Sequence, residues 1–239
     1  MIWLRSAVFF VLLSSSVVLF GVPIILLGRL APNLLLSRIA RAWGQLILVL
    51  LRVICGLGYR VRGMENLPSE SAIVLCKHQS AWETIAIRAL FPLPQTWVLK
   101  RELLRIPIFG GALAAFDPIA IDRSAGRRAV KQLLEQGKRW LDQGRWVIIF
   151  PEGTRVPPGE RTSYGIGGAL LAEKSGRVVV PVAHNAGLFW ARRSFLKYPG
   201  VVDLEIGAPI PVEGRRAVEI NREAERWIES AVAELPTQR

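Results

Sequence analysis

Apolar residues dominate the first quarter of the chain. Residues 7–27 are apolar except for three consecutive serines, and this length suffices for one helix across a membrane hydrocarbon core. After a turn at residues 28–33, residues 34–57 are again largely apolar and predict a second helix. We therefore expect an N-terminal helical hairpin that anchors the protein to a membrane. A signal peptide is the first alternative, although no small-residue cleavage site closes the run, and a packed pair of core helices is the second.

The polar side chains of the second helix share one narrow face. They lie within an arc of about 60° on a helical wheel: Arg38, Arg41, Gln45 and Arg52. A basic stripe on an otherwise apolar helix is typical of a helix in the bilayer interface, with arginines directed toward lipid phosphates. Arg52, Arg60 and Arg62 then predict, by the positive-inside tendency, that the rest of the chain faces the cytoplasm.

Beyond a polar, proline-containing linker at residues 63–70, short apolar runs alternate with amphipathic stretches. The runs predict strands at residues 72–76, 95–99, 119–121, 146–150, 178–182 and 201–206, and the stretches predict helices at residues 79–90, 124–144, 165–175 and 216–235. This alternation predicts an α/β fold with a mostly parallel sheet covered by helices. We expect two units, a membrane-associated hairpin over residues 1–62 and an α/β domain over residues 63–239.

Charge and cysteine content narrow the possible partners. The 239 residues are 51% hydrophobic, yet the formal net charge is +12. Excess arginine suits an anionic surface, such as membrane phospholipid, nucleic acid or a phosphorylated substrate. No recognition motif accompanies the charge, which argues against nucleic acid. Cys55 and Cys76 lie far apart, without a Cys/His cluster, so we expect a reducing compartment and no metal.

His78 and Glu83 form the first candidate for chemistry. His78 follows the strand predicted at residues 72–76, at the edge of an α/β sheet where ligands usually bind. Five residues along one regular helix would separate the two side chains by roughly 140°, so we expect His78 to precede the helix and Glu83 to reach back to it. Such a carboxylate would fix the imidazole tautomer and leave the other nitrogen free to take a proton.

Two further segments carry a family resemblance. The predicted strand at residues 146–150 runs into Pro151-Glu152-Gly153-Thr154-Arg155, and the one at residues 119–121 leads into Asp122-Arg123. In this order, HQSAWE, IAIDR and FPEGTR resemble the signature blocks of the glycerolipid acyltransferases, most closely the bacterial 1-acylglycerol-3-phosphate acyltransferases. The resemblance covers roughly residues 67–187, including an apolar run at residues 178–181 that looks like the family's fourth block.

The resemblance implies roles for these residues. His78, held by Glu83, would be the general base for the 2-hydroxyl of a lysophosphatidic acid, and the product would be phosphatidic acid. The guanidinium groups of Arg123 and Arg155 would bind the acceptor phosphate. The remaining residues of the same phosphate-binding segment are Glu152, Gly153 and Thr154. Ordinary surface arginines or internal ion pairs are the alternatives, and Glu152 suits the orientation of an arginine or a bond to the glycerol hydroxyl.

Three positions depart from the family pattern. Glu83 stands where Asp is usual, Lys77 stands where Asn is common, and residues 163–165 lack a frequent Lys. His184 has no carboxylate at a comparable spacing, which favours a structural role. Along the predicted strand, the side chain of Cys76 points to the same side as that of His78. An acyl-enzyme formed on Cys76 is therefore an open alternative to direct attack by the acceptor hydroxyl.

The resemblance also implies partners and a location. We expect no metal or cofactor, acyl-CoA or acyl carrier protein as the co-substrate, lysophosphatidic acid and membrane phospholipid as partners, and the inner (cytoplasmic) membrane as the location. The alternatives are an acyltransferase for another lyso-lipid, such as lyso-ornithine lipid or a lysophospholipid, and a non-catalytic lipid-binding protein. Activity on acceptors without a phosphate would indicate the lyso-ornithine lipid acyltransferase, and absence of any turnover would indicate the lipid-binding protein.

Overall fold

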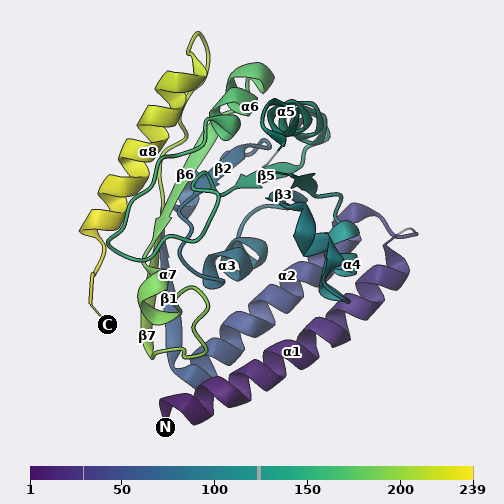
Figure 1. Ribbon diagram of the computed structural model, residues 1–239, viewed down its shortest axis with the longest axis vertical. Helices are drawn as coiled ribbons and strands as arrows, with labels where there is room; N and C mark the ends of the chain where they lie inside the picture. Colours follow the sequence, from purple (N-terminus) through teal and green to yellow (C-terminus); the bar gives the residue numbers. More distant parts are fainter. Residues whose placement is uncertain (29, 123–124, 239) are drawn as a thin grey trace.

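A single seven-stranded sheet forms the centre of the protein. The computed structural model describes residues 1–28, 30–122 and 125–238 (Figure 1). The strands lie in the order β1-β7-β6-β2-β5-β3-β4, and only the β6–β7 pair among them is antiparallel. The strands are β1 (Leu57–Arg62), β2 (Ile73–Cys76), β3 (Gln95–Lys100), β4 (Ile119–Ile121), β5 (Trp146–Ile149), β6 (Val179–His184) and β7 (Gly200–Ile206). The predicted α/β fold with a mostly parallel sheet is confirmed.

Helices cover both faces of this sheet. The α-helices are α1 (Ile2–Leu27), α2 (Asn33–Leu50), α3 (Trp82–Leu90), α4 (Phe109–Ala114), α5 (Arg127–Asp142), α6 (Gly167–Ser175), α7 (Ala186–Phe189) and α8 (Ala217–Glu234). A π-helical turn (Leu51–Cys55) extends α2, and short 3-10 turns lie at Met64–Asn66 and Arg101–Arg105. The six predicted strands and the predicted helices are present, with ends that shift by a few residues.

The alternation along β2 separates two layers of core. Ile73 and Leu75 join a cluster with α5, α6 and α8, whereas Val74 and Cys76 join a cluster with α1, α2 and α3. Because successive side chains of a strand point to opposite faces, the same alternation continues into the residues after β2. Lys77 accordingly turns toward α8, with which its ammonium forms an ion pair, and His78 turns toward α3.

The N-terminal helices form the predicted hairpin and pack directly on the α/β part (Figure 1). A Cβ atom added at Gly44 of α2 would lie 3.1 Å from the Ala89 Cβ and 3.2 Å from the Ile85 carbonyl oxygen, so α2 and α3 approach closely. By length and composition, α1 and the continuous helix at Asn33–Cys55 are both long and apolar enough to cross a membrane. The outer side of α1 exposes large apolar residues, among them Trp3, Leu4, Leu19 and Leu26.

Arg41 differs from the rest of the basic stripe. Arg38, Gln45 and Arg52 are exposed, but the Arg41 guanidinium turns inward and donates a hydrogen bond to the carbonyl of Phe91. The contact links α2 to the end of α3. One of the three arginines predicted to face lipid phosphate therefore binds protein backbone instead.

The strand β1 was not predicted, and it lies within the segment expected as the N-terminal unit. It pairs in parallel with β7 at the edge of the sheet. Arg60 and Arg62 on β1 form ion pairs with Asp203 and Glu205 of β7. An edge strand with exposed arginines lacks a clear apolar pattern, and its partner lies about 140 residues away. Residues 1–62 thus contribute a strand to the sheet as well as the hairpin.

Candidate active site

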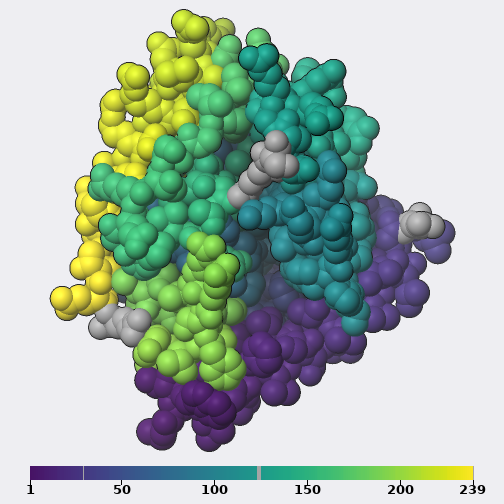
Figure 2. Space-filling model, in the orientation of Figure 1, coloured from purple at the N-terminus to yellow at the C-terminus, as the bar shows by residue number. Residues whose placement is uncertain are grey.

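Three of the segments singled out in the sequence leave the sheet at the same edge. The strands β2, β5 and β6 are parallel neighbours, with Leu75 opposite both Ile149 and Pro181. Their carboxyl ends lead into Lys77-His78, Phe150-Pro151-Glu152 and His184-Asn185, respectively. Figure 2 shows the surface hollowed between the teal segment around α4 and the green segments that follow β5 and α7. The sheet topology therefore brings the HQSAWE and FPEGTR segments together.

His78 and Glu83 are in direct contact. The Nδ1 atom of His78 lies 2.7 Å from Oε1 of Glu83, as expected for a histidine before a helix and a carboxylate in its first turn. The Glu83 side chain is fully buried, whereas 14% of the His78 side chain is exposed. None of the described residues hydrogen-bonds Nε2 of His78. The arrangement leaves this nitrogen for a group from outside the protein.

Glu83 is held as a carboxylate by several donors. Its Oε1 accepts hydrogen bonds from the backbone N–H groups of Gln79 at 3.0 Å and Ser80 at 2.8 Å, in addition to the His78 ring. Burial alone would raise the Glu83 pKa, but the His184 and His78 imidazoles and the Ser80 N–H outweigh it and hold the pKa below its ordinary value. An ionised Glu83 accepts the Nδ1 proton and so fixes the tautomer with a free Nε2. The two amides are occupied and do not supply an oxyanion site.

The ring and the backbone of His78 are both fixed by the FPEGTR segment and by Val156, the residue that follows it. The imidazole stacks on Phe150, with ring centroids 4.0 Å apart and planes inclined by 18°. The His78 N–H donates to Oε2 of Glu152 at 2.7 Å, and the His78 carbonyl accepts from the Val156 N–H at 2.8 Å. These three contacts leave the imidazole little freedom to turn, which favours a preorganised base.

The predicted phosphate-binding residues occupy different environments. Glu152 is buried and pairs with Lys77, Gly153 adopts a left-handed conformation with φ of 69°, and Thr154 is exposed. The Nε atom of Arg155 is buried and has no hydrogen-bond partner among the described residues. A guanidinium in that state suits an incoming anion. Arg123 lies outside the described residues, so its predicted role stays a prediction.

His184 adopts the structural role that the sequence favoured. It is fully buried, and its Nε2 donates to the Lys77 carbonyl at 2.8 Å while its Nδ1 accepts from the Ala186 N–H. This bonding pattern requires a neutral imidazole, consistent with a pKa that burial lowers. Both nitrogens are occupied, so His184 offers no lone pair to a substrate.

The surroundings of Cys76 do not favour a reactive thiol, and the described residues form no cluster of metal ligands. Within residues 1–28, 30–122 and 125–238, no group of three or more His, Cys, Asp or Glu side chains is arranged to hold a metal ion. Cys76 is fully buried, and burial raises the pKa of its thiol well above the ordinary value. A buried neutral thiol is a poor nucleophile, which favours the core role for Cys76 over an acyl-enzyme.

Comparison with known proteins decides the family. The sequence model of the Acyltransferase family matches residues 58–185. The chain is 42% identical to the 1-acyl-sn-glycerol-3-phosphate acyltransferase of Pseudomonas aeruginosa, over 97% of this chain and 91% of the relative. The chain belongs to the Acyltransferase family. It is also 27% identical to the human 1-acyl-sn-glycerol-3-phosphate acyltransferase alpha, over 71% of this chain and 61% of the relative.

The fold of this Acyltransferase family member matches a solved structure. The crystal structure of the 1-acyl-sn-glycerophosphate acyltransferase PlsC from Thermotoga maritima superposes with a TM-score of 0.80 at 23% identity. The match covers 97% of this chain and 94% of that one. The N-terminal hairpin lies inside the matched region, since nearly the whole chain is covered.

Sequence reasoning missed some contacts of the site. The sequence places Phe150 at the end of a strand and indicates no further role, yet its ring stacks on the His78 imidazole and its centroid lies 5.9 Å from that of the Trp97 ring. The place of Phe150 immediately before Pro151 at a strand end was the available signal. The Lys77–Glu229 ion pair joins residues 152 positions apart and left no signal in the sequence.

Proposed function

We propose that this protein transfers a fatty acyl group from an acyl thioester to the 2-hydroxyl of 1-acyl-sn-glycerol-3-phosphate, giving phosphatidic acid. The observation that carries the proposal is the 2.7 Å contact between His78 Nδ1 and the buried Glu83 carboxylate, at a strand edge shared with the FPEGTR segment. The relatives named as 1-acyl-sn-glycerol-3-phosphate acyltransferases support this choice of acceptor. Acyl-CoA and acyl carrier protein are the two candidate donors.

In the proposed reaction His78 acts first as a base and then as an acid. Its Nε2 takes the proton of the acceptor 2-hydroxyl while the oxygen attacks the thioester carbonyl carbon, and Glu83 stabilises the imidazolium. The tetrahedral intermediate collapses with cleavage of the carbon–sulfur bond, and the imidazolium proton passes to the departing thiolate. The ester and the free thiol are the products, and the proposed reaction uses no metal or further cofactor.

The acceptor phosphate is proposed to bind the FPEGTR segment. Arg155, whose buried Nε lacks a protein partner among the described residues, is the principal contact, and Arg123 is its proposed companion. Gly153 lets the backbone approach the ligand, because it has no Cβ and its φ is 69°. Thr154 offers a hydroxyl at the exposed rim. Glu152 contributes through the protein contacts of its buried carboxylate.

An apolar region suited to lipid chains lies next to the aromatic side chains beside His78. Phe150 contacts Trp97, and the Arg88 guanidinium lies over the Trp97 ring, 5.0 Å from its centroid. Arg88 also lines a cavity of about 80 Å³ between α1, α2, α3 and α4, which is otherwise apolar. We place the apolar tail of a substrate along this side of the site, next to the hairpin that is proposed to contact the bilayer.

The proposed location is the inner (cytoplasmic) membrane, with the α/β part facing the cytoplasm. The exposed apolar side of α1 supports contact with lipid, and the packing of α2 against α3 holds the rest of the chain close to the hairpin. The exposed arginines Arg52, Arg60 and Arg62 support a cytoplasmic orientation. Membrane phospholipid is thus a proposed partner.

The test is an assay of phosphatidic acid formation by the purified, detergent-solubilised protein. The reaction mixtures contain lysophosphatidic acid with either acyl-CoA or acyl carrier protein loaded with the same chain. We expect turnover with at least one donor and its loss in His78→Ala protein that remains folded. Turnover on lyso-ornithine lipid but not on lysophosphatidic acid would contradict the proposed acceptor. No turnover on any lyso-lipid would contradict the proposed reaction.

A further inference from the structure

A chain of buried charges joins the C-terminal helix to the candidate base. The Lys77 ammonium lies 2.8 Å from Oε1 of Glu152 and 2.8 Å from Oε1 of Glu229 on α8. The side chains of Lys77 and Glu152 are 1% and 0% exposed, and that of Glu229 is 12% exposed. Tyr164 donates its hydroxyl hydrogen to Glu229 Oε1 at 2.9 Å, and Arg161 lies 3.4 Å from Oε2.

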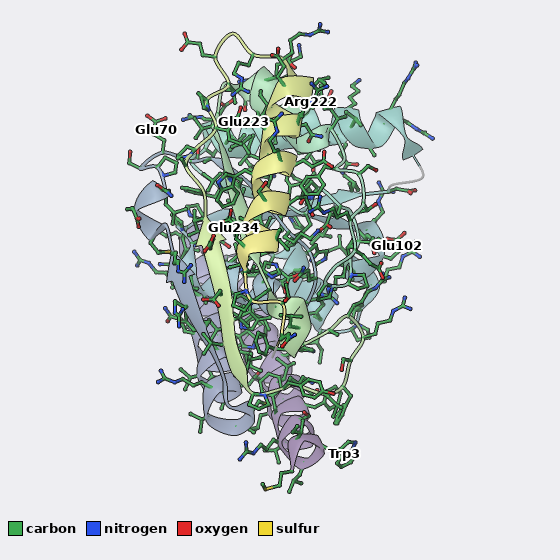
Figure 3. All side chains as sticks on the ribbon, turned by 90° about the vertical axis from the view of Figure 1, so that its left-hand side faces the viewer. Trp3, Glu70, Glu102, Arg222, Glu223 and Glu234 are labelled. Carbon is green, nitrogen blue, oxygen red and sulfur yellow. The ribbon has the colours of Figure 1, made fainter. Side chains whose placement is uncertain are left out.

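The inner end of this chain is the backbone of His78. The second oxygen of Glu152 accepts the His78 N–H at 2.7 Å. Its outer end is α8, which lies across the front of the view in Figure 3, with Glu223 near one end and Glu234 near the other. Glu229 lies between them on this helix. The ion pairs therefore connect a helix remote in sequence to the residue that carries the proposed base.

We propose that Lys77 is a positioning residue: bridged to Glu229, its ammonium keeps Glu152 ionised so that this carboxylate fixes the backbone of His78. The inference rests on the proposed function, because its effect is read in turnover. A Glu152 carboxylate accepts a strong, charge-assisted hydrogen bond from the His78 N–H, whereas a protonated Glu152 is a weaker acceptor with a competing donor of its own. The position and orientation of the imidazole would then depend on the charge of Glu152.

The cation is essential to this arrangement because two carboxylates share it. Without Lys77, Glu152 and Glu229 would face each other in a buried site, and one of them would take up a proton. Burial already raises the pKa of Glu152, and the Lys77 ammonium and the His78 N–H oppose that rise while Glu229 adds to it. Removal of the ammonium should therefore raise the Glu152 pKa further, toward neutrality.

The other groups near Lys77 and Glu152 do not change charge in the same pH range. Burial raises the pKa of the Cys76 thiol, and burial with the nearby Glu229 raises the pKa of Tyr164 well above its ordinary value. Burial lowers the pKa of His184, and the contacts of Glu83 hold its pKa low. Arg161 stays charged. An additional ionisation that appears only without Lys77 therefore belongs to the Glu152–Glu229 pair, of which Glu152 is the more deeply buried.

The experiment compares the pH dependence of turnover in Lys77→Met and wild-type protein. With lysophosphatidic acid and the active donor saturating, kcat is measured from pH 6 to 9. We expect Lys77→Met to lose at least about tenfold at pH 6, and the loss to shrink toward pH 9 as Glu152 regains its charge. Lys77→Arg keeps a cation and should retain the wild-type acid limb, that is, the fall of kcat toward low pH. In Lys77→Met/Glu229→Gln the like charge is gone, so the acid limb should move back toward the wild-type position.

A matched control and a second variant keep the test decisive. Lys138→Met removes a lysine that pairs with Asp142 four residues along α5 and is 52% exposed, and it should leave both kcat and the acid limb unchanged. If Lys77→Met does not fold, Lys77→Gln takes its place, since it also removes the ammonium that opposes the rise of the Glu152 pKa. Its kcat should fall at a higher pH than in wild-type protein, and an unchanged pH profile would overturn the proposal.

Failure of the proposed function and failure of the positioning role of Lys77 would give different results. Wild-type protein without turnover would contradict the proposed function itself. Wild-type turnover together with a Lys77→Met loss that is equal at every pH, or with no loss, would leave that function standing and overturn the positioning role of Lys77.

Discussion

The protein contains two histidines, and both lie beside the same carboxylate. Glu83 Oε1 is 2.7 Å from Nδ1 of His78, and Glu83 Oε2 is 3.8 Å from Nε2 of His184. His184 is fully buried, and both of its ring nitrogens hydrogen-bond backbone groups. His78 is partly exposed, and only its Nδ1 is bonded among the described residues. Proximity to a carboxylate therefore does not make a base. Access and an unused lone pair distinguish the two residues.

Removal of the shared carboxylate charge should have the largest effect. Glu83→Gln keeps the shape of the side chain but no longer stabilises an imidazolium, and its amide hydrogens would confront the N–H groups of Gln79 and Ser80. We expect kcat to fall about 10²- to 10⁴-fold. Steady-state turnover with a thermal melt on the same sample is the measurement. Unchanged turnover would remove Glu83 from the account of how the two histidines differ.

Arg155, like His78, is partly exposed and can be reached by a substrate. Its replacement by Ala should raise the KM for lysophosphatidic acid about 10- to 100-fold, because a charge-assisted contact of about 1.5–3 kcal/mol is lost. The matched control is Arg192→Ala, since Arg192 is exposed and, among the described residues, its guanidinium hydrogen-bonds the Arg155 carbonyl alone. An equal loss with an acceptor that lacks the phosphate would contradict phosphate binding by Arg155.

His184 should affect stability rather than chemistry, and with a characteristic pH dependence. His184→Gln keeps a donor and an acceptor but loses the rigid ring that places them at the Lys77 carbonyl and the Ala186 N–H, and it should cost about 1–3 kcal/mol of stability. The His184 pKa is lowered in the folded protein, so the unfolded state binds more protons below its ordinary pKa of about 6.5. Wild-type stability should thus fall from pH 7 to pH 5.

In the His184→Gln variant, the contribution of His184 to this fall in stability between pH 7 and pH 5 should be absent. Thermal melts of both proteins at a series of pH values in one detergent measure the difference. A wild-type slope that persists unchanged in the variant would assign the pH dependence to other groups.

Gly153 should give the smallest effect. An alanine at a φ of 69° costs about 1–2 kcal/mol and would strain the turn that carries Arg155. We expect kcat/KM to fall about five- to tenfold. Gly144→Ala imposes a similar strain, at a φ of 75° in the turn after α5 with open space around the added Cβ. It should lower stability without lowering kcat/KM, and an equal kinetic loss there would contradict a local role for Gly153.

Periodicity and local motifs were sufficient for most of the architecture. The strands β2 and β5, and β6 up to His184, are continuous apolar runs because both of their faces are buried, and such runs are readable without a structure. The His78–Glu83 contact was also predictable, since five residues of chain fix it and no distant partner is needed.

Contacts between distant segments were not readable in the same way. The edge strand β1 exposes arginines and depends on β7 for its pairing, and Lys77 finds Glu229 only after α8 packs across the sheet. The inward turn of Arg41 to the Phe91 carbonyl likewise depends on how closely α2 packs on α3. In each case tertiary packing decides what the local pattern leaves open.

Of the two histidines, His78 and not His184 is the proposed base. The most direct test of this assignment is kcat for phosphatidic acid formation by His78→Ala and His184→Gln, measured side by side on samples shown to be folded by thermal melting. We expect a loss of about 10²- to 10⁴-fold for His78→Ala and less than about threefold for folded His184→Gln. A large loss confined to His184→Gln, or equal losses in both folded variants, would contradict it.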